Sequence, residues 1–309
     1  MSMTDLLLRR GLKLGHLRIV AALAQTGQIG TAAAALGITQ PAASRLLAEV
    51  ERITGHPVHV RDGRGVRLTA QGSALATRAA RILTEIADAG REISEIGDGT
   101  SGHVRIGSVT GPAMERILPA LNTVRQSYPD LTVEVEIAPS DILGELLVSG
   151  RIDFALARLP EGRDAALYTL EPMEEEPVSL VTGRQHPLVR ASDLTARLLL
   201  DYDWLLPGPG AILRETVLSR LTALGLPAPS GQIATSSFLL TLAMLQQSDA
   251  IAPLASAVAR RFADGVDAPY AILPMDLGIR VAPYGLITRT GGRLTPAASR
   301  LKSLILSDP

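Results

Sequence analysis

The chain has 309 residues, of which 46% are hydrophobic and 20% charged, enough apolar material for two domains with buried cores. It has no cysteine and no apolar run of membrane-spanning length, which excludes disulfides, thiolate metal sites, cysteine nucleophiles and a transmembrane helix. The five histidines lack the HExxH spacing of zinc enzymes, so neither a metal nor another cofactor is expected. The first leucines precede the first arginines, the reverse of a signal peptide, which predicts a cytoplasmic protein.

The net charge of −1 conceals a division along the chain. Residues 1–72 contain nine Lys and Arg against four Asp and Glu, a net charge of +5. Residues 73–309 contain 21 against 27, a net charge of −6. A basic head on an acidic body favours a polyanion as the partner of the head, although chance alone would explain such a split equally well.

Three short helices are predicted before residue 55. Residues 17–24 and 31–36 have apolar positions on one face and are separated by a glycine-containing break. Thr39 can cap a third helix that has Pro41 in its first turn and ends before Gly55. Two helices joined by a short turn with glycine form a helix-turn-helix, whose second helix can enter the major groove of DNA.

The outward face of this third helix has the chemistry of base recognition. Glutamine pairs with adenine edges, arginine with guanine or phosphate, and proline can touch a thymine methyl group. A threonine at the helix start can bind phosphate with the free backbone N–H groups. The predicted DNA contacts of this helix are Thr39, Gln40, Pro41, Ser44 and Arg45.

Residues 58–69 read as two short strands around an Asp-Gly-Arg-Gly turn. Arg61, Arg64 and Arg67 recur at every third position of this hairpin. Directly behind a helix-turn-helix, such a hairpin is typical of a wing that places arginines along phosphates or in the minor groove. The alternative is an ordinary solvated hairpin. His59 is expected to be a half-buried residue of the wing rather than a pH switch.

Residues 70–96 lack proline and carry apolar residues at alternating steps of four and three. This period of 3.5 predicts a helix of about 40 Å with a coiled-coil seam. The seam consists of Leu75, Ala79, Ile82, Ile86, Ala89, Ile93 and Ile96. We expect it to join two chains, which fits recognition of two half-sites in a dyad operator. The alternative is an amphipathic helix packed on its own domain.

From residue 104 onward, predicted strands and helices alternate, which favours parallel α/β sheets with crossover helices. We predict three domains: a DNA-binding head over 1–72, a linker helix with its hinge over 73–103, and an effector domain over 104–309. The effector domain is expected to form two subdomains. Subdomain I comprises 104–173 and 276–309, and subdomain II comprises 174–275.

A cleft between these subdomains is the expected ligand site, because ligands of α/β sheets bind beyond the carboxyl ends of strands. Hydroxyl groups stand at three such ends, and the loop 207–210 could close over a ligand. They suit an anion or a polyol, and Arg158 could neutralise an anion; the alternative is that they only cap helices. The predicted effector contacts are Thr110, Ser140, Arg158, Gly208, Thr235 and Ser236. The only tryptophan, Trp204, is expected to pack in the core.

These residues resemble the LysR-type transcriptional regulators along almost the whole chain. The match is most specific in residues 31–44, Thr-Ala-Ala-Ala-x-Leu-Gly-Ile-Thr-Gln-Pro-Ala-x-Ser, followed by Arg61-x-x-Arg64-x-x-x-Leu68-Thr69-x-x-Gly72. Farther landmarks are Tyr128-Pro129, Gly150-Arg151-Ile152-Asp153 and His186-Pro187-Leu188. Residues 235–240 and 248–250 are loosely similar to the subgroup that regulates sugar-binding-protein and aromatic-acid genes.

The resemblance implies a winged helix-turn-helix head, a long linker helix and a two-subdomain effector domain similar to periplasmic binding proteins. It implies a homodimer that assembles further into a homotetramer. Such a protein senses a small molecule and controls nearby genes, and it contacts RNA polymerase if it activates them. The resemblance implies no enzymatic activity. Two other classes of protein are alternatives. One is a cytosolic solute-binding protein whose head only mediates interactions, and the other is an enzyme. The sequence contains no phosphate loop, nucleophile elbow or distinctive acid/base pair.

Overall fold

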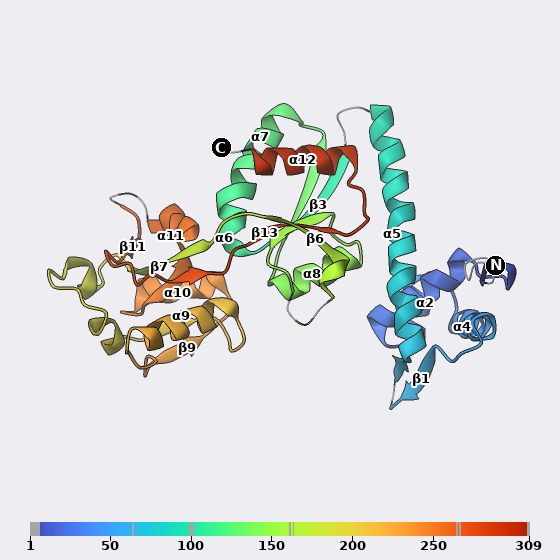
Figure 1. Ribbon diagram of the computed structural model, residues 1–309, viewed down its shortest axis with the longest axis horizontal. Coiled ribbons are helices and arrows are strands. Elements are labelled where there is room, and N and C mark those ends of the chain that lie inside the picture. The colour runs from blue at the N-terminus through green and yellow to red at the C-terminus, as the bar shows by residue number, and fades with distance from the viewer. Residues whose placement is uncertain are drawn as a thin grey trace.

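The computed structural model describes residues 7–63, 65–98, 102–160, 162, 164–263, 265 and 267–307. It shows a small helical head, one long helix and a two-lobed α/β body (Figure 1). The long helix runs from the head along one side of the body. In the part of the chain described, no helix is both long and apolar enough to cross a membrane.

The head contains the three predicted helices and the predicted hairpin. Its elements are α2 (Leu14–Thr26), α3 (Ile29–Ala35), α4 (Gln40–Thr54), β1 (His59–Asp62) and β2 (Gly65–Leu68). The first two helices are longer than predicted, because the break between them is confined to Gly27, in the left-handed conformation at φ 64°, and Gln28. Their apolar faces meet α4 in one buried core, formed by Ile19, Val20, Leu23, Ala32, Ala33, Ala43, Leu47, Val50 and Val58.

The linker helix α5 (Ala70–Asp98) has 29 residues and is about 44 Å long at 1.5 Å per residue. Its first turns pack against α2, where Ala79 is completely buried with Leu17 and Ala21. The remainder lies along the body (Figure 1). One helix therefore contacts both the head and the effector domain of its own chain.

Subdomain I is built on a five-stranded sheet in the order β4-β3-β5-β13-β6. Strand β3 pairs in parallel with β4 and β5, as predicted, whereas β13 returns antiparallel to β5 and β6. Its strands are β3 (Gly102–Ser108), β4 (Leu131–Ile137), β5 (Phe154–Ala157), β6 (Tyr168–Pro172) and β13 (Gly285–Arg289). Its helices are α6 (Thr110–Pro112), η1 (Ala113–Ile117), α7 (Leu118–Ser127), α8 (Ser140–Val148), η2 (Ala165–Leu167) and α12 (Pro296–Leu306).

Subdomain II is centred on β7, which pairs antiparallel with β10, β11 and β12. The prediction of a parallel sheet therefore does not hold around β7, whereas β8 and β9 pair in parallel and Trp204 forms a further parallel bridge with Ile251. Its strands are β7 (Glu176–Gly183), β8 (Trp204–Leu206), β9 (Gln232–Ala234), β10 (Ala252–Ala255), β11 (Tyr270–Ile272) and β12 (Arg280–Val281). Its helices are η3 (Pro187–Arg190), η4 (Leu198–Asp201), α9 (Ile212–Ala223), α10 (Phe238–Gln247) and α11 (Ser256–Ala263). Trp204 is completely buried, as expected.

The chain crosses between the subdomains twice, after β6 and after β12. The second crossing follows Val281 rather than residue 276, because β12 still pairs with Glu176 and Pro177 of β7. The two crossings are hydrogen-bonded to each other: the Met173 N–H donates to the carbonyl of Tyr284 at 3.0 Å, and the Tyr284 N–H donates to the carbonyl of Glu174 at 3.1 Å. They form a paired connection between the two subdomains.

Candidate nucleic-acid interface and effector cleft

Helix α4 divides sharply into a buried face and an exposed face. Ala43, Leu47 and Val50 are at most 1% exposed and anchor the helix in the head core. Thr39 caps the helix, and its Oγ1 accepts a hydrogen bond from the Ala42 N–H at 3.4 Å. The residues predicted to contact DNA all lie on the exposed side; they are Thr39, Gln40, Pro41, Ser44 and Arg45.

Two carboxylates of α4 tie the helix to the rest of the head, although nothing in the sequence distinguishes them from solvated charges. Buried His16 accepts a hydrogen bond from the Lys13 N–H on Nδ1, which leaves its Nε2–H to donate to Glu49 at 3.0 Å. Glu51 accepts from the Val58 N–H at 3.0 Å and lies 3.2 Å from Nδ1 of half-buried His59. The first contact ties α4 to α2, and the second ties it to the wing.

The wing presents arginines on both of its faces. Arg61 pairs with Val66 and Arg67 with Val60, and because neighbouring residues of a strand alternate, Arg61 and Arg67 point to opposite sides of the hairpin. Both are exposed, and Arg67 lies 3.5 Å from the exposed carboxylate of Asp62. The third predicted arginine, Arg64, lies outside the described residues.

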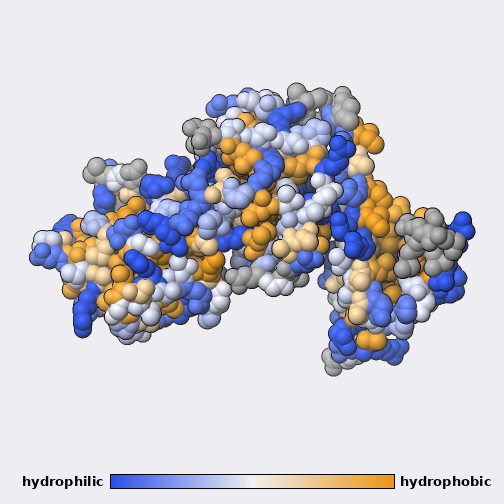
Figure 2. Space-filling model, in the orientation of Figure 1, coloured by the Kyte–Doolittle hydropathy of each residue, from blue (hydrophilic) through white to orange (hydrophobic). Residues whose placement is uncertain are grey.

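The predicted seam of α5 is partly used within the chain. Leu75 and Ala79 pack in the head, against α2. Beyond them, Ile82, Ile86 and Ile93 are 44%, 48% and 74% exposed, and Figure 2 shows apolar surface along this helix. The side chain of Ile96 lies outside the described part of the structure. An apolar row of this size on an exposed helix remains available to a second chain.

On the effector domain, the predicted contacts of subdomain I gather at one edge of the sheet. Thr110, Ser140 and Arg158 follow the carboxyl ends of the parallel strands β3, β4 and β5. Thr110 is exposed, and the hydroxyl of Ser140 accepts a hydrogen bond from the Arg158 N–H at 3.2 Å. The topology therefore brings these three residues to the edge where ligands of such sheets bind.

The guanidinium of Arg158 already has partners within the chain. Its Nη2 donates to Glu176 Oε2 at 2.8 Å, and its Nε donates to the carbonyl of Ala282 at 2.7 Å. The side chains of Arg158 and Glu176 are only 10% and 14% exposed. Glu176 also fills the space beside Gly111, where a β-carbon would come within 1.8 Å of its Oε1. The arginine thus bridges subdomain I to β7 and to the second crossing, and an anionic effector would meet a guanidinium that is already paired with a carboxylate.

The remaining predicted contacts belong to subdomain II. Gly208 is half-buried and follows β8, while Thr235 and Ser236 follow β9. Thr235 Oγ1 accepts a hydrogen bond from the Ser237 N–H at 3.0 Å, and Ser237 caps α10. The hydroxyls of Thr235 and Ser237 therefore have capping roles, and that of Ser236 is exposed.

Nowhere in the described ranges do three or more histidine and carboxylate side chains gather closely enough to hold a metal ion. The head, the linker helix and the two-lobed body define a winged helix-turn-helix regulator with an attached binding domain. Two family models match the chain: "Bacterial regulatory helix-turn-helix protein, lysR family" over residues 14–73 and "LysR substrate binding domain" over residues 97–308.

Known proteins match over nearly the whole chain. It is 39% identical over 248 residues to HTH-type transcriptional regulator GbpR of Rhizobium radiobacter, covering 80% of this chain and 82% of that protein. It is 35% identical over 292 residues to GbpR of Azospirillum brasilense, covering 94% and 85%. The structure of full-length CbnR complexed with its target DNA has the same fold, with a TM-score of 0.65 at 20% identity, covering 96% of this chain and all of that one. The chain belongs to the LysR family of DNA-binding transcriptional regulators.

Proposed function

We propose that α4 reads the major groove through Gln40, Ser44 and Arg45, and that the wing straddles the neighbouring backbone. The exposed face of α4 carries this proposal. Its three polar side chains stand opposite a fully buried apolar face, so the helix is held firmly while its recognition groups stay free. Arg61 and Arg67 on opposite faces of the hairpin suit a wing that meets phosphates on both sides.

We further propose that the effector is an uncharged, hydroxyl-bearing small molecule. The one predicted cation of the cleft, Arg158, is neutralised by Glu176 at 2.8 Å. A carboxylate effector would have to compete with that buried pair, whereas hydroxyl groups can donate to Glu176 and accept from the hydroxyls of Thr110 and Ser236. Of the two chemistries expected from the sequence, the polyol is therefore favoured over the anion.

For the assembly, we propose that two chains form a homodimer through Ile82, Ile86 and Ile93. Two such dimers then form a tetramer on a dyad operator. The exposure of these isoleucines supports the dimer. Contact with RNA polymerase and a cytoplasmic location follow if the protein activates chromosomal genes.

Footprinting on the DNA upstream of the protein's own gene tests the DNA interface. We expect protection of a dyad, lost in Gln40→Ala/Arg45→Ala and retained in Arg78→Ala, which removes one exposed arginine from α5 instead. Protection that survives in the first variant would contradict the proposed reading face. If the wild-type chain protects no DNA there but binds other genomic fragments, the interface stands and only autoregulation is wrong.

The cleft is tested on the same footprint with a panel of neutral sugars and polyols and a matched panel of their acids. We expect a neutral compound to alter the protection pattern, and Ser140→Ala/Thr235→Ala to weaken its effect. A response to acids alone would refute the uncharged effector. An unchanged response in the double variant would refute the site.

A further inference from the structure

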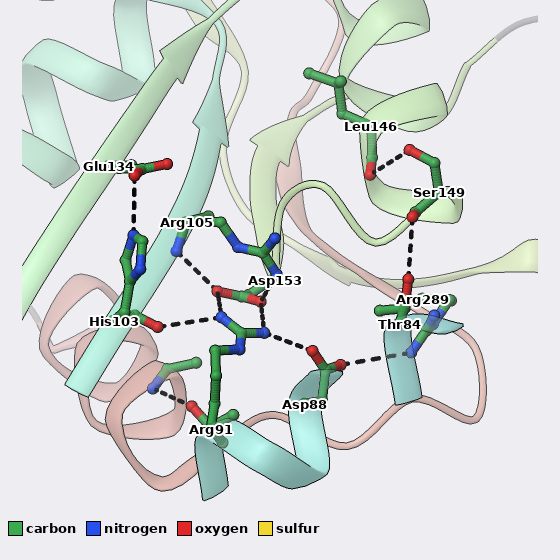
Figure 3. Close-up of polar contacts among 12 residues, drawn as sticks. Thr84, Asp88, Arg91, His103, Arg105, Glu134, Leu146, Ser149, Asp153 and Arg289 are labelled. Carbon is green, nitrogen blue, oxygen red and sulfur yellow. Dashed lines mark hydrogen bonds and ion pairs between the residues drawn. The ribbon is translucent and has the colours of Figure 1, made fainter. Parts of the chain in front are cut away.

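The side of α5 that faces the body carries a row of polar residues at steps of four, three and four. These residues are Thr84, Asp88, Arg91 and Glu95. All four contact subdomain I, and Figure 3 shows these contacts for Thr84, Asp88 and Arg91. Asp88 does so through Arg289 of β13, whose Nη2 lies 4.0 Å from Asp88 Oδ2. Nothing in the sequence distinguishes this row from a solvated helix face.

At the centre of the row, Arg91 of α5 is paired with Asp153, which directly precedes β5. Arg91 Nη2 donates to Asp153 Oδ1 at 2.7 Å and Nη1 donates to Oδ2 at 3.2 Å, a two-pronged contact of the strong kind. Arg91 Nη2 also donates to Asp88 at 2.6 Å, while Nη1 donates to the carbonyl of His103 at 3.2 Å. The side chains of Asp153 and Arg91 are 7% and 19% exposed, so water screens the pair little.

Asp153 is held in place from subdomain I as well. Its Oδ2 accepts a hydrogen bond from the Arg105 N–H at 2.7 Å, and its Oδ1 lies 3.1 Å from Arg105 Nη2. Burial alone would raise the pKa of Asp153, but the hydrogen bonds from Arg91 and Arg105 and their positive charges lower it. Burial would likewise lower the pKa of Arg91, and its contacts with Asp153 and Asp88 raise it instead. Both groups are therefore charged at neutral pH.

About two turns of α5 before Arg91, Thr84 packs against Gly150 of subdomain I. Thr84 Oγ1 donates to the carbonyl of Ser149 at 3.1 Å. A β-carbon on Gly150 would lie 2.1 Å from Thr84 Oγ1, and the backbone there has a φ of +72°. Glycine is thus required at this position for two reasons: the backbone turn and the close approach of the helix.

At the far end, Glu95 contacts α12. Glu95 is 7% exposed, and its Oε2 accepts a hydrogen bond from the Ala297 N–H at 3.0 Å, in the first turn of α12. Between the ends, Arg289 of β13 donates to Glu85 at 2.5 Å. The contacts from Thr84 to Glu95 span about 16 Å of helix, which resists rotation as well as translation.

We propose that Gly150 and Asp153 form a seat for the linker helix, and that Thr84 and Arg91 lock α5 into it. The head, α5 and subdomain I then move as one rigid arm. Subdomain II is joined to this arm through the two hydrogen-bonded crossings and the Arg158–Glu176 pair. The consequence for gene control, that an effector acts by displacing subdomain II against this arm, rests on the proposed function.

The absence of cysteine from the sequence makes the seat directly testable by spin labelling. Labels are placed on the full-length chain at exposed Thr77 of α5 and exposed Gln126 of α7, as Thr77→Cys/Gln126→Cys, and the labelled protein is diluted with unlabelled chain. Double electron–electron resonance then reports the distance between α5 and subdomain I within one chain. We expect one narrow distance in the wild-type background.

The test variant is Arg91→Gln/Asp153→Asn, which removes both charges of the pair together. Of their partners it leaves one charge of each sign, Asp88 and Arg105, whose side chains are 18% and 25% exposed. We expect it to broaden the distance distribution, and Thr84→Val, a change of similar volume, to broaden it less. The matched control, Asp141→Asn/Arg151→Gln, removes one charge of each sign from exposed positions whose side chains take no part in these contacts, and it should keep the narrow distance. Circular dichroism and heat unfolding check that each variant is folded.

A broad distribution in the wild-type background, or a distribution as narrow in folded Arg91→Gln/Asp153→Asn as in the wild type, would overturn the seat. A second label pair, Thr77→Cys/Ser219→Cys, spans from α5 to α9 of subdomain II, and its distribution should be the broader of the two in the wild-type chain. An equally narrow distribution would contradict a displacement of subdomain II against the arm. Both measurements need neither DNA nor effector, so a failed footprint would count against the proposed function and leave this result standing.

Discussion

Replacing Gly72 with alanine should displace the linker helix from the wing. Gly72 lies in the first turn of α5, where a β-carbon would come 1.8 Å from the carbonyl oxygen of Val58 and 2.8 Å from its carbon. That carbonyl cannot easily yield, because it accepts a hydrogen bond from the Thr69 N–H at 3.1 Å, and the Val58 N–H donates to Glu51. The helix start must instead move by about 1.5 Å to restore an ordinary carbon–oxygen contact of about 3.3 Å.

The expected cost follows from two opposing effects. Overpacking costs about 1–3 kcal/mol, and the rigid backbone partner puts Gly72→Ala at the upper end of that range. Alanine recovers about 1 kcal/mol of helix propensity over glycine. We therefore expect a net loss of about 2 kcal/mol in the stability of the head, together with weaker DNA binding, because the wing is attached to the same carbonyl.

Hydrogen exchange of the α4 amides is the suitable assay, because a chain with several domains need not unfold in one transition. Gly15→Ala in α2 is the matched control. Gly15 is exposed, and nothing lies within 4 Å of its β-carbon position, so this change should stabilise the head by about 0.4–1 kcal/mol. If the α4 amides exchange as slowly in the Gly72→Ala protein as in the Gly15→Ala protein, the steric reasoning is wrong.

Three further changes test separate contacts. Ile86→Asp should convert the dimer to monomers in sedimentation experiments without altering exchange of the α4 amides, and dimers that persist would exclude the exposed seam. His16→Ala should lower operator affinity, since Glu49 is released toward Arg45 one turn away; Glu49→Gln added to it should restore part of the binding, and no restoration would show that the released charge is not the cause. Folding lowers the pKa of Asp153 below its ordinary 3.8, so its stabilisation is fully present above that pH and is lost as the pH falls further. The difference in stability between the wild-type chain and Asp153→Asn should therefore shrink only below about pH 4, and a loss near pH 6 would assign the effect to another group.

The head was predictable from sequence because its signals are local. Thr39 as a cap, Pro41 in the first turn and Gly55 at φ +75° define α4 almost to the residue. The same holds for α12, which begins at Pro296 behind the capping hydroxyl of Thr295. Such signals depend only on neighbours within a turn, so the rest of the fold cannot override them.

The functional contacts between distant segments were not predictable in this way. An arginine on a helix looks the same in a sequence whether it faces water or Asp153, which lies 62 positions away. Arg158 was correctly placed at the edge of the sheet, but its partner Glu176 comes from the other subdomain. Likewise, the apolar period of α5 continues through Ala79, and only the packing of α2 shows that the seam available to another chain begins after it.

The two rows of α5 explain how one helix can join chains and position domains at once. The seam residues Ile82, Ile86 and Ile93 precede the residues Thr84, Asp88 and Glu95 of the polar row by two positions each. Two residues correspond to a rotation of about 200° around an α-helix, so the rows lie on opposite sides. A second chain can cover the isoleucines without disturbing the contacts to subdomain I. In the proposed dimer the seam would fix the spacing between the two heads, while the proposed seat would fix each effector domain to its own helix. If both proposals hold, a signal from the effector would reach the DNA through a surface of subdomain II that meets another copy, or by breaking the seat.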